Sequence, residues 1–463
     1  GTFKGRQAMT RYEAAALLNA CLDRVTEVTD ELKRLMAEFE KELAVLRGRV
    51  DGLEARVGEL EANQFSTTTK LNGQTTFVLG GNTYSGTGKV SRRNDAIREG
   101  ILDQGELPRK NSKLAKRIKE TQGGTVFNYD LRLHLDTSFT GKDLLRTRLR
   151  AGNFGNSPYG GGGIVGLDAM EVAFEGAPGA NTVMVDRLFY QFPVGSSFTA
   201  TVGGRVRQDD MLPVWPSLYP ADTILDVFTY AGAPGTYSLN LGGGAGMWWK
   251  SGGFSVAANY VSANADNGNP SLGGVMTDGS ASTATVQLAY AVDNWGLAAA
   301  YTYTSENSGG IYPGNGTPLA VLAMTEGNTN SFGLSGWWGP KSAGWVPSVS
   351  AGWGINSTNG PRRLGDITSQ SWYVGLMWSD LFMKGNAAGM AVGQPTFVTN
   401  LEKGNLPKGD GNYAFEWWYK FQVTDNISVT PAIYYLSRPL AALTGTNATL
   451  NNFGGLIKTT FKF

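Results

Sequence analysis

The chain shows two periodicities of apolar residues, one after the other. From Leu22 to Leu60 the apolar positions are separated alternately by three and four residues, with one polar member, Thr29. From Ser66 to the last residue, short runs instead alternate apolar and polar side chains and are separated by polar, glycine-rich segments. The first spacing is typical of a coiled-coil helix, and a period of two is typical of β-strands. The sequence therefore predicts two unlike parts, a helical segment 22–64 and a β-rich segment 65–463.

The helical segment carries charges that indicate a parallel assembly of identical chains. With Leu22 at heptad position a, each g residue and the e residue five places later have opposite signs, as for Glu42 and Arg47. Such pairs meet only between parallel helices in register, and two apolar g residues widen the seam, which favours three helices. We expect a trimeric coiled coil over 22–64; the alternative is a single helix with a solvated charged face. The predicted seam residues are Leu22, Val25, Leu32, Met36, Phe39, Leu43, Leu46, Val50, Leu53, Val57 and Leu60.

The β-rich segment has the pattern of a transmembrane barrel. In the final run, the odd positions 457–463 are Ile, Thr, Phe and Phe, whereas the even positions are Lys, Thr and Lys. A face directed at lipid alternating with a face directed at water, and aromatic residues at the ends of the runs, are typical of outer-membrane strands. A soluble β-sandwich or propeller is the alternative, but the sequence has no repeat of the length of a propeller blade.

Counting strands backwards from Phe463 fixes their number. Short turns should alternate with long loops in an outer-membrane barrel, and they do so down to about residue 183. Residues 167–177 resemble one more strand, which would give seventeen and place the N-terminus on the wrong side. Treating them as part of one long, inward-folded loop over 153–182 gives sixteen. The predicted fold is therefore an all-β barrel of sixteen antiparallel strands, preceded by the α-helical coiled coil.

The composition excludes several other classes of protein. Of the 463 residues, 63 are Gly and only 17% are charged. This composition is typical of many short strands whose outer face is not in contact with water. The net charge of +1 argues against nucleic-acid binding. One Cys and one His exclude a disulfide and a Cys or His metal cage, so we expect no metal and no cofactor. No stretch approaches 18 apolar residues, so we expect no transmembrane helix.

Arginines define the predicted interior of the barrel. In the run 144–151, Arg146, Arg148 and Arg150 alternate with apolar residues, and an arginine facing lipid costs about 2–4 kcal/mol at the bilayer centre. The same rule turns the arginines of three neighbouring strands inward. The predicted basic wall is Arg132, Arg146, Arg148, Arg150, Arg187, Arg205 and Arg207. The predicted constriction-loop acids are Asp168, Glu171, Glu175, Asp209, Asp210, Asp222 and Asp226.

Two interpretations of this wall remain open. In the first, arginines opposite an acidic loop produce a transverse electric field across the pore that sets its ion selectivity, here in favour of anions. Alternatively, the same arginines are a salt-bridged scaffold that holds the loops in place. The basic loop 81–123 is expected to plug the barrel, to face the anionic leaflet or to be merely solvated, and His134 is expected to line the pore rather than to catalyse a reaction.

Several short stretches resemble a known family. Residues 1–5, the run Thr10-Arg11-Tyr12-Glu13 and residues 18–22 resemble the end of a surface-layer homology (SLH) domain. The runs 138–144 and 429–431 resemble cyanobacterial SLH-domain porins of the carbohydrate-selective OprB-like superfamily. This resemblance implies that 1–21 is the remnant of an SLH domain that binds a peptidoglycan-linked polysaccharide through Arg11. It also implies a periplasmic coiled coil and a homotrimeric outer-membrane barrel over 65–463.

The sequence thus predicts a porin rather than an enzyme. We expect it to conduct inorganic ions and small hydrophilic solutes passively across the outer membrane, tethered to the cell wall by its SLH and coiled-coil region. The alternatives are a carbohydrate-selective porin and a barrel that is largely plugged by its loops and acts as an envelope anchor. An outer-membrane hydrolase acting through His134 is a further alternative.

Overall fold

The computed structural model describes residues 12–14, 16–17, 30–63, 68–88, 113–220, 224–306, 308, 310–360, 364–403, 409–445 and 447–463. The chain divides into two compact units, Gly1–Thr69 and Lys70–Phe463, which are treated separately below. Of the residues predicted to be functional, Arg11, Leu22, Val25 and Asp222 lie outside the described residues.

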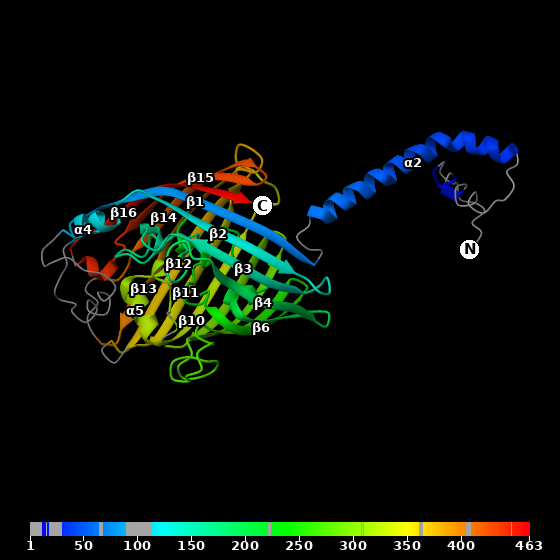
Figure 1. Ribbon diagram of the computed structural model, residues 1–463. Coiled ribbons are helices and arrows are strands. Elements are labelled where there is room, and N and C mark those ends of the chain that lie inside the picture. Colours follow the sequence, from blue (N-terminus) through cyan, green and yellow to red (C-terminus); the bar gives the residue numbers. More distant parts are fainter. Residues whose placement is uncertain are drawn as a thin grey trace. The chain divides into compact units, whose positions relative to one another are not determined.

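The first unit contains α2, a helix of 34 residues from Asp30 to Asn63 (Figure 1). Two of the predicted seam residues, Val50 and Leu53, are 48% and 61% exposed on this helix. Exposed apolar side chains at heptad positions are expected of a surface that packs against another helix. A helix in this segment is confirmed, whereas its association into a coiled coil stays a prediction. Each helix within the described ranges is too short or too polar to span a bilayer.

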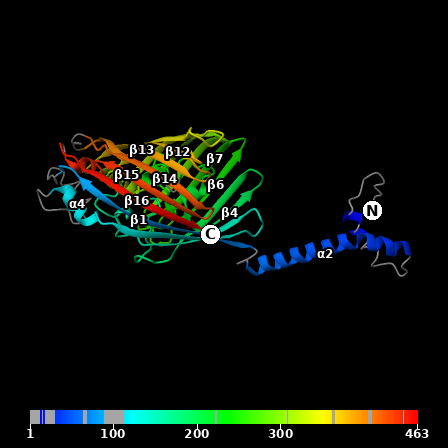
Figure 2. The same ribbon diagram turned by 90° about the horizontal axis from the view of Figure 1, so that it is seen from above.

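The second unit is a closed antiparallel barrel in which each strand pairs with its neighbours in sequence and β1 pairs with β16 (Figures 1 and 2). Sixteen strands are found in the described part of the chain, as predicted. They are β1 (Thr69–Ser85), β2 (Val126–Thr137), β3 (Leu144–Gly152), β4 (Met184–Val194), β5 (Phe198–Arg207), β6 (Leu241–Ser251), β7 (Phe254–Ser262), β8 (Ser282–Val292), β9 (Trp295–Thr304), β10 (Asn328–Trp338), β11 (Ser348–Asn359), β12 (Asp366–Ser379), β13 (Ala387–Leu401), β14 (Tyr413–Thr424), β15 (Ile427–Ser437) and β16 (Asn451–Lys462).

Short helices in the connections were not predicted from the sequence. Two are α-helices, α4 (Leu114–Gln122) between β1 and β2 and α5 (Pro318–Glu326) between β9 and β10. Five single-turn helices are also found among the described residues. These are η2 (Pro158–Gly160), η3 (Gln208–Met211), η4 (Asp226–Thr229), η5 (Pro313–Asn315) and η6 (Ala441–Thr444).

The register of neighbouring strands separates an apolar outer face from an inner face. Leu79 of β1 pairs with Ile457 of β16, and both side chains are about half exposed on the outside. Three positions earlier, Thr76 pairs with Thr460; both are buried inside, and their hydroxyl oxygens lie 3.3 Å apart. The alternation predicted for the final run is therefore confirmed, and it follows from the period of two that a strand imposes on its side chains.

Two long connections fold into the barrel. The segment between β3 and β4 contains residues 167–177, which form only isolated bridges at Met170 and Glu175 and no strand of the barrel, as predicted. Its buried side chains pack against inner residues of β15 and β16, including Tyr434 and Leu456. The segment between β5 and β6 also lies inside the barrel, where the carbonyl oxygen of Ala231 accepts a hydrogen bond from a serine of β10 and Tyr219 donates to Glu416 of β14. Beside β2 and β3 the interior stays accessible, since the inner side chains of Arg146 and Asp136 are 31% and 21% exposed.

Candidate functional site

The arginines of β3 lie on the inner face of the barrel. In the pairing of β2 with β3, Arg150 lies opposite Arg132, Arg148 opposite His134, and Arg146 opposite Asp136. The residues between them on both strands are mostly leucines, which take the outer face. Four arginines side by side would repel one another, so the cluster requires carboxylates close by.

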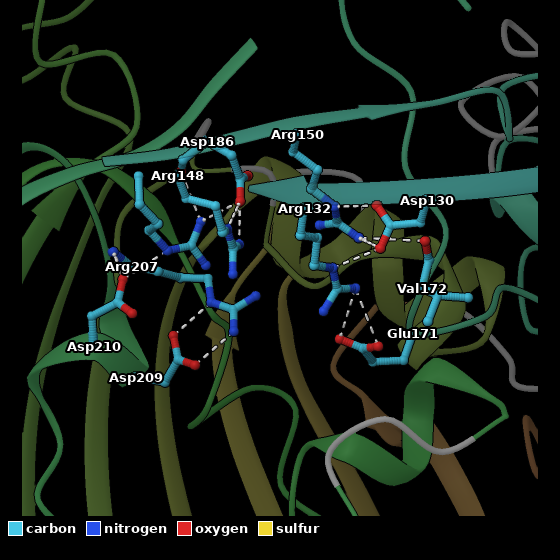
Figure 3. A network of polar contacts seen from close by, with 11 residues as sticks. Asp130, Arg132, Arg148, Arg150, Glu171, Val172, Asp186, Arg207, Asp209 and Asp210 are labelled. Atoms are coloured by element: carbon cyan, nitrogen blue, oxygen red, sulfur yellow. Dashed lines mark hydrogen bonds and ion pairs between the residues drawn. The ribbon is translucent and has the colours of Figure 1, made fainter. Parts of the chain in front are cut away.

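The first carboxylate group joins β2, β3 and the loop between β3 and β4 (Figure 3). Asp130 of β2 accepts from Arg132 Nε and from Arg150 Nε, each at 2.6 Å. Arg132 Nη2 also reaches both carboxylate oxygens of Glu171 in the loop at 3.4 Å. Arg150 Nη2 donates to the carbonyl oxygen of Val172 at 3.3 Å. The wall therefore holds the inner loop by charge-assisted hydrogen bonds on two successive loop residues.

The second group joins β3, β4 and η3. Arg148 donates to Asp186, a residue of β4 that is almost fully buried. Arg187, only 1% exposed, donates from Nη1 to the carbonyl oxygen of Asp186 and from Nε to Asp210 of η3 at 2.7 Å. Asp186 and Arg187 are adjacent and both point inward because the β3–β4 register shifts at this position. A β-bulge thus gives two consecutive residues the same interior face.

The third group lies where β5 enters the second inner loop. Arg207 Nε and Nη2 form a bidentate pair with Asp209 at 2.5 and 2.6 Å. The backbone N–H of Arg207 donates to Asp210, which fixes the start of η3. Arg207 is a quarter exposed, so this pair borders water-accessible space inside the barrel. Figure 3 shows Arg207 and Arg148 lying side by side, with Arg132 and Glu171 across from them.

The network has as many carboxylates as arginines. Within the described residues, each of its six guanidinium groups has at least one carboxylate within 3.4 Å. The arginines are Arg132, Arg146, Arg148, Arg150, Arg187 and Arg207. The carboxylates are Asp130, Asp136, Asp186, Glu171, Asp209 and Asp210. The network is therefore strongly polar but carries little net charge, because each of its arginines has a carboxylate partner.

One predicted wall residue has a different position. Arg205 lies opposite Leu188 across β4 and β5, where the register shifts by one residue. Leu188 is 43% exposed on the outer face, and paired residues of a sheet share a face. The register therefore places Arg205 on the outside with Leu188, and the prediction that it faces the interior is wrong. The sequence alternation alone could not reveal this bulge.

The predicted loop acids divide into two sets. Glu171, Asp209 and Asp210 pair with the arginines as described above. Glu175 instead accepts a hydrogen bond from the backbone N–H of Gly155 at 2.6 Å and so fixes the loop internally. Asp168 and Asp226 are buried and accept hydrogen bonds from tyrosine and asparagine side chains instead.

Asp168 fastens the first inner loop to β1 and β16, which adjoin β2 on the side away from β3. Its carboxylate is fully buried and accepts from Tyr84 Oη at 2.8 Å, Asn82 Nδ2 at 3.0 Å and Asn452 Nδ2 at 3.4 Å. Burial raises the pKa of Asp168 to about 8, although the hydrogen bond from Tyr84 opposes this shift. The loop is thus held on one side by Asp168 and on the other by the arginines.

Two further carboxylates join connections to one another. Asp226 of η4 accepts from Asn315 of η5 at 3.1 Å, and burial, followed by the charge of Glu171, raises the pKa of Asp226 to about 7. Asp410, which was not predicted, accepts from Thr317, from Val398 N at 2.9 Å and from Ala442 N at 3.3 Å. Burial raises the pKa of Asp410 to about 6.

The strand carboxylates Asp130, Asp136 and Asp186 are the site residues that the sequence reasoning missed as partners. For two of them a signal was present, because Asp130, Arg132, His134 and Asp136 alternate along one run and so share a face. Asp186 had no such signal, since its inward orientation depends on the bulge beside Arg187.

Comparison with known proteins identifies the family. The sequence matches the carbohydrate-selective porin family OprB over residues 27–463. The chain belongs to this family. An uncharacterized protein of Nostoc sp. is 33% identical over 516 residues, covering 100% of this chain and 79% of that protein. An uncharacterized protein of Synechocystis sp. is 31% identical over 504 residues, covering 100% and 83%.

A solved structure shares the fold of the barrel. The structure of Pseudomonas putida OprB at high pH aligns with a TM-score of 0.54 at 12% identity and covers 88% of this chain and 97% of that chain. Membership of the OprB family together with the β-barrel indicates the outer membrane, and proteins of this family and fold are typically channels rather than enzymes. The cyanobacterial relatives and the family match agree with the porin part of the resemblance seen in the sequence, whereas the SLH remnant over 1–21 stays a prediction.

Proposed function

We propose that the barrel conducts small uncharged polyhydroxylated solutes of monosaccharide size, together with inorganic ions, passively across the outer membrane. The observation that carries this proposal is the network of six arginines and six carboxylates on the inner face, in which each arginine has at least one carboxylate partner. Sugar hydroxyls both donate and accept hydrogen bonds, so they suit a surface that presents guanidinium donors beside carboxylate acceptors. Family membership supports the same substrate class.

The pairing also predicts weak discrimination between ions. An unpaired wall of arginines would concentrate anions in the channel, as the sequence analysis expected. With a carboxylate within 3.4 Å of each guanidinium, the fields of the two groups largely cancel at the distance of a passing ion. The two earlier interpretations of the arginines therefore merge, because the same ion pairs hold the loops and border the channel.

Swelling of proteoliposomes tests this function. Purified protein in liposomes should cause swelling in isotonic glucose, with a slower rate in an isotonic trisaccharide. Empty liposomes and liposomes with heat-denatured protein are the controls. Absence of both swelling and ionic current would overturn the proposal in favour of a loop-plugged barrel that acts as an envelope anchor.

We further propose that 22–64 forms the parallel trimeric coiled coil and that 1–21 contacts a peptidoglycan-linked polysaccharide through Arg11. The exposure of Val50 and Leu53 on α2 and the opposite charges at g and e positions support the association. Analytical ultracentrifugation of the purified protein tests it, with a trimer expected and a monomer contradicting it. Pull-down by isolated cell-wall sacculi, compared between the intact chain and Arg11→Ala, tests the tether.

A further inference from the structure

The connection between β7 and β8, residues 263–281, is an ordered loop on the outer surface of the barrel. Asn264 organises it: its side chain donates to the carbonyl oxygens of Leu272 at 2.7 Å and Gly279 at 2.9 Å and accepts from Ala281 N at 2.8 Å. The backbone N–H of Gly274 donates to the carbonyl oxygen of Asn264 at 3.0 Å. These bonds close the loop on itself, so its shape does not depend on a neighbour.

Three contacts show that this loop folds back over the outer face. Tyr260 of β7 pairs with Ala245 and Ala284, which are exposed outer residues, and its hydroxyl accepts from Met276 N at 2.9 Å. Ser262, on the same face, is fully buried and donates to the carbonyl oxygen of Gly274 at 2.8 Å. The third contact is made with β6 and agrees with this placement.

That contact is at Gly243, an outer position of β6. A Cβ built there would lie 2.6 Å from the Cβ of Ala265, so the absence of a side chain at Gly243 makes room for the loop. Because Tyr260 lies two residues before the end of β7, the loop descends by about 7 Å along the strand. The ends of barrel strands lie near the membrane interface, the zone in which amphipathic protein segments bury their apolar side chains.

The loop presents apolar side chains at this level. Leu272, Val275 and Met276 are 62%, 54% and 78% exposed. The loop has no Lys or Arg, and its two acidic residues, Asp266 and Asp278, are exposed. The apolar side chains continue the exposed outer band of β7 and β8, which includes Val256, Val286 and Leu288. An exposed apolar cluster marks a contact with a membrane or with another protein, and its continuity with a surface that faces lipid favours the membrane.

We propose that residues 272–276 insert into the lipid of the outer leaflet and anchor this side of the barrel at the membrane interface. The occupant is the lipid that already surrounds the neighbouring strands of an outer-membrane barrel. The alternative occupant, a second copy of the chain, is distinguished by the experiment.

Site-directed spin labelling tests the proposal on the full-length chain. The single cysteine, Cys21, is replaced by serine, and a nitroxide is attached in turn to Met276→Cys, Gly268→Cys and Leu288→Cys. Gly268 is the matched control, because a Cβ at this exposed position of the same loop meets no atom within 4 Å. Leu288, 57% exposed on β8, is the lipid-facing reference. Accessibility to oxygen and to a water-soluble nickel chelate is then measured in liposomes.

The label at 276 should resemble the reference at 288, with high accessibility to oxygen and loss of accessibility to the nickel chelate. The label at 268 should remain accessible to the chelate. Equal accessibility of 276 and 268 to the chelate would overturn the proposal. Dipolar broadening at 276 or disulfide-linked dimers of Met276→Cys would also overturn it, in favour of contact between two copies. Resistance to unfolding in detergent confirms that each labelled variant has folded.

Discussion

Removing the negative charge of Glu171 should make the channel prefer anions. Glu171→Gln keeps the size of the side chain and removes one of the six carboxylates of the network. Arg132 remains bound to Asp130 at 2.6 Å, so the guanidinium keeps its position while its second charged partner is lost. The interior then carries one net positive charge beside the first inner loop.

The size of the effect follows from Coulomb's law. The interaction energy between one unit charge and a passing ion about 7 Å away is about 0.6 kcal/mol in water-like surroundings. Screening at 0.1 M salt reduces this energy to about 0.3 kcal/mol. The contribution has opposite signs for anions and cations. The anion-to-cation permeability ratio should therefore rise by about threefold.

Reversal potentials of single channels in asymmetric KCl measure this ratio. Glu175→Gln is the control, because Glu175 belongs to the same loop but accepts from the backbone N–H of Gly155 rather than from an arginine. The double variant Arg132→Gln/Glu171→Gln should return the ratio to that of the unaltered protein. An unchanged ratio in Glu171→Gln, or an equal change in Glu175→Gln, would refute the argument that paired charges set the selectivity.

Three further predictions concern Asp168, Arg187 and Val50. Because the pKa of Asp168 is raised from its ordinary 3.8 to about 8, raising the pH from about 4 to about 8 should progressively weaken the attachment of the first inner loop. After correction for the intrinsic pH dependence of amide exchange, the protection of residues 160–175 against hydrogen exchange should fall over this range, and Asp168→Asn should remove that fall. Arg187→Met leaves Asp210 without its guanidinium partner and should cost about 3–5 kcal/mol of stability, measured by thermal unfolding in detergent. Val50→Asp should dissociate the proposed trimer of a peptide spanning 22–64, measured by ultracentrifugation, whereas a variant at an outer heptad position should not.

The sequence predicted the barrel because its signals are local and repeated. Alternation with a period of two marks each strand, and the alternation of short turns with long loops excluded residues 167–177 as a seventeenth strand. The inward orientation of Arg146, Arg148 and Arg150 followed from the cost of charge in lipid. These inferences need only the neighbours of a residue in sequence.

The partners of the arginines could not be predicted in the same way. Which carboxylate meets which guanidinium depends on strand register and on bulges, as the pairing of Arg187 with Asp210 shows. The bulge in β5 likewise turned Arg205 outward. The path of the inner loops, fastened by Asp168 and Glu171, arises from contacts between residues that are far apart in sequence.

Proteoliposome swelling with three solutes of equal size and different charge tests the central claim most directly. Glucose, gluconate and glucosamine are compared under isotonic conditions in the same preparation. A channel bordered by paired charges should admit all three at similar rates, with glucose not slower than either ion. Much faster entry of gluconate than of glucose and glucosamine would show that the arginines act as unpaired positive charges and would contradict the account.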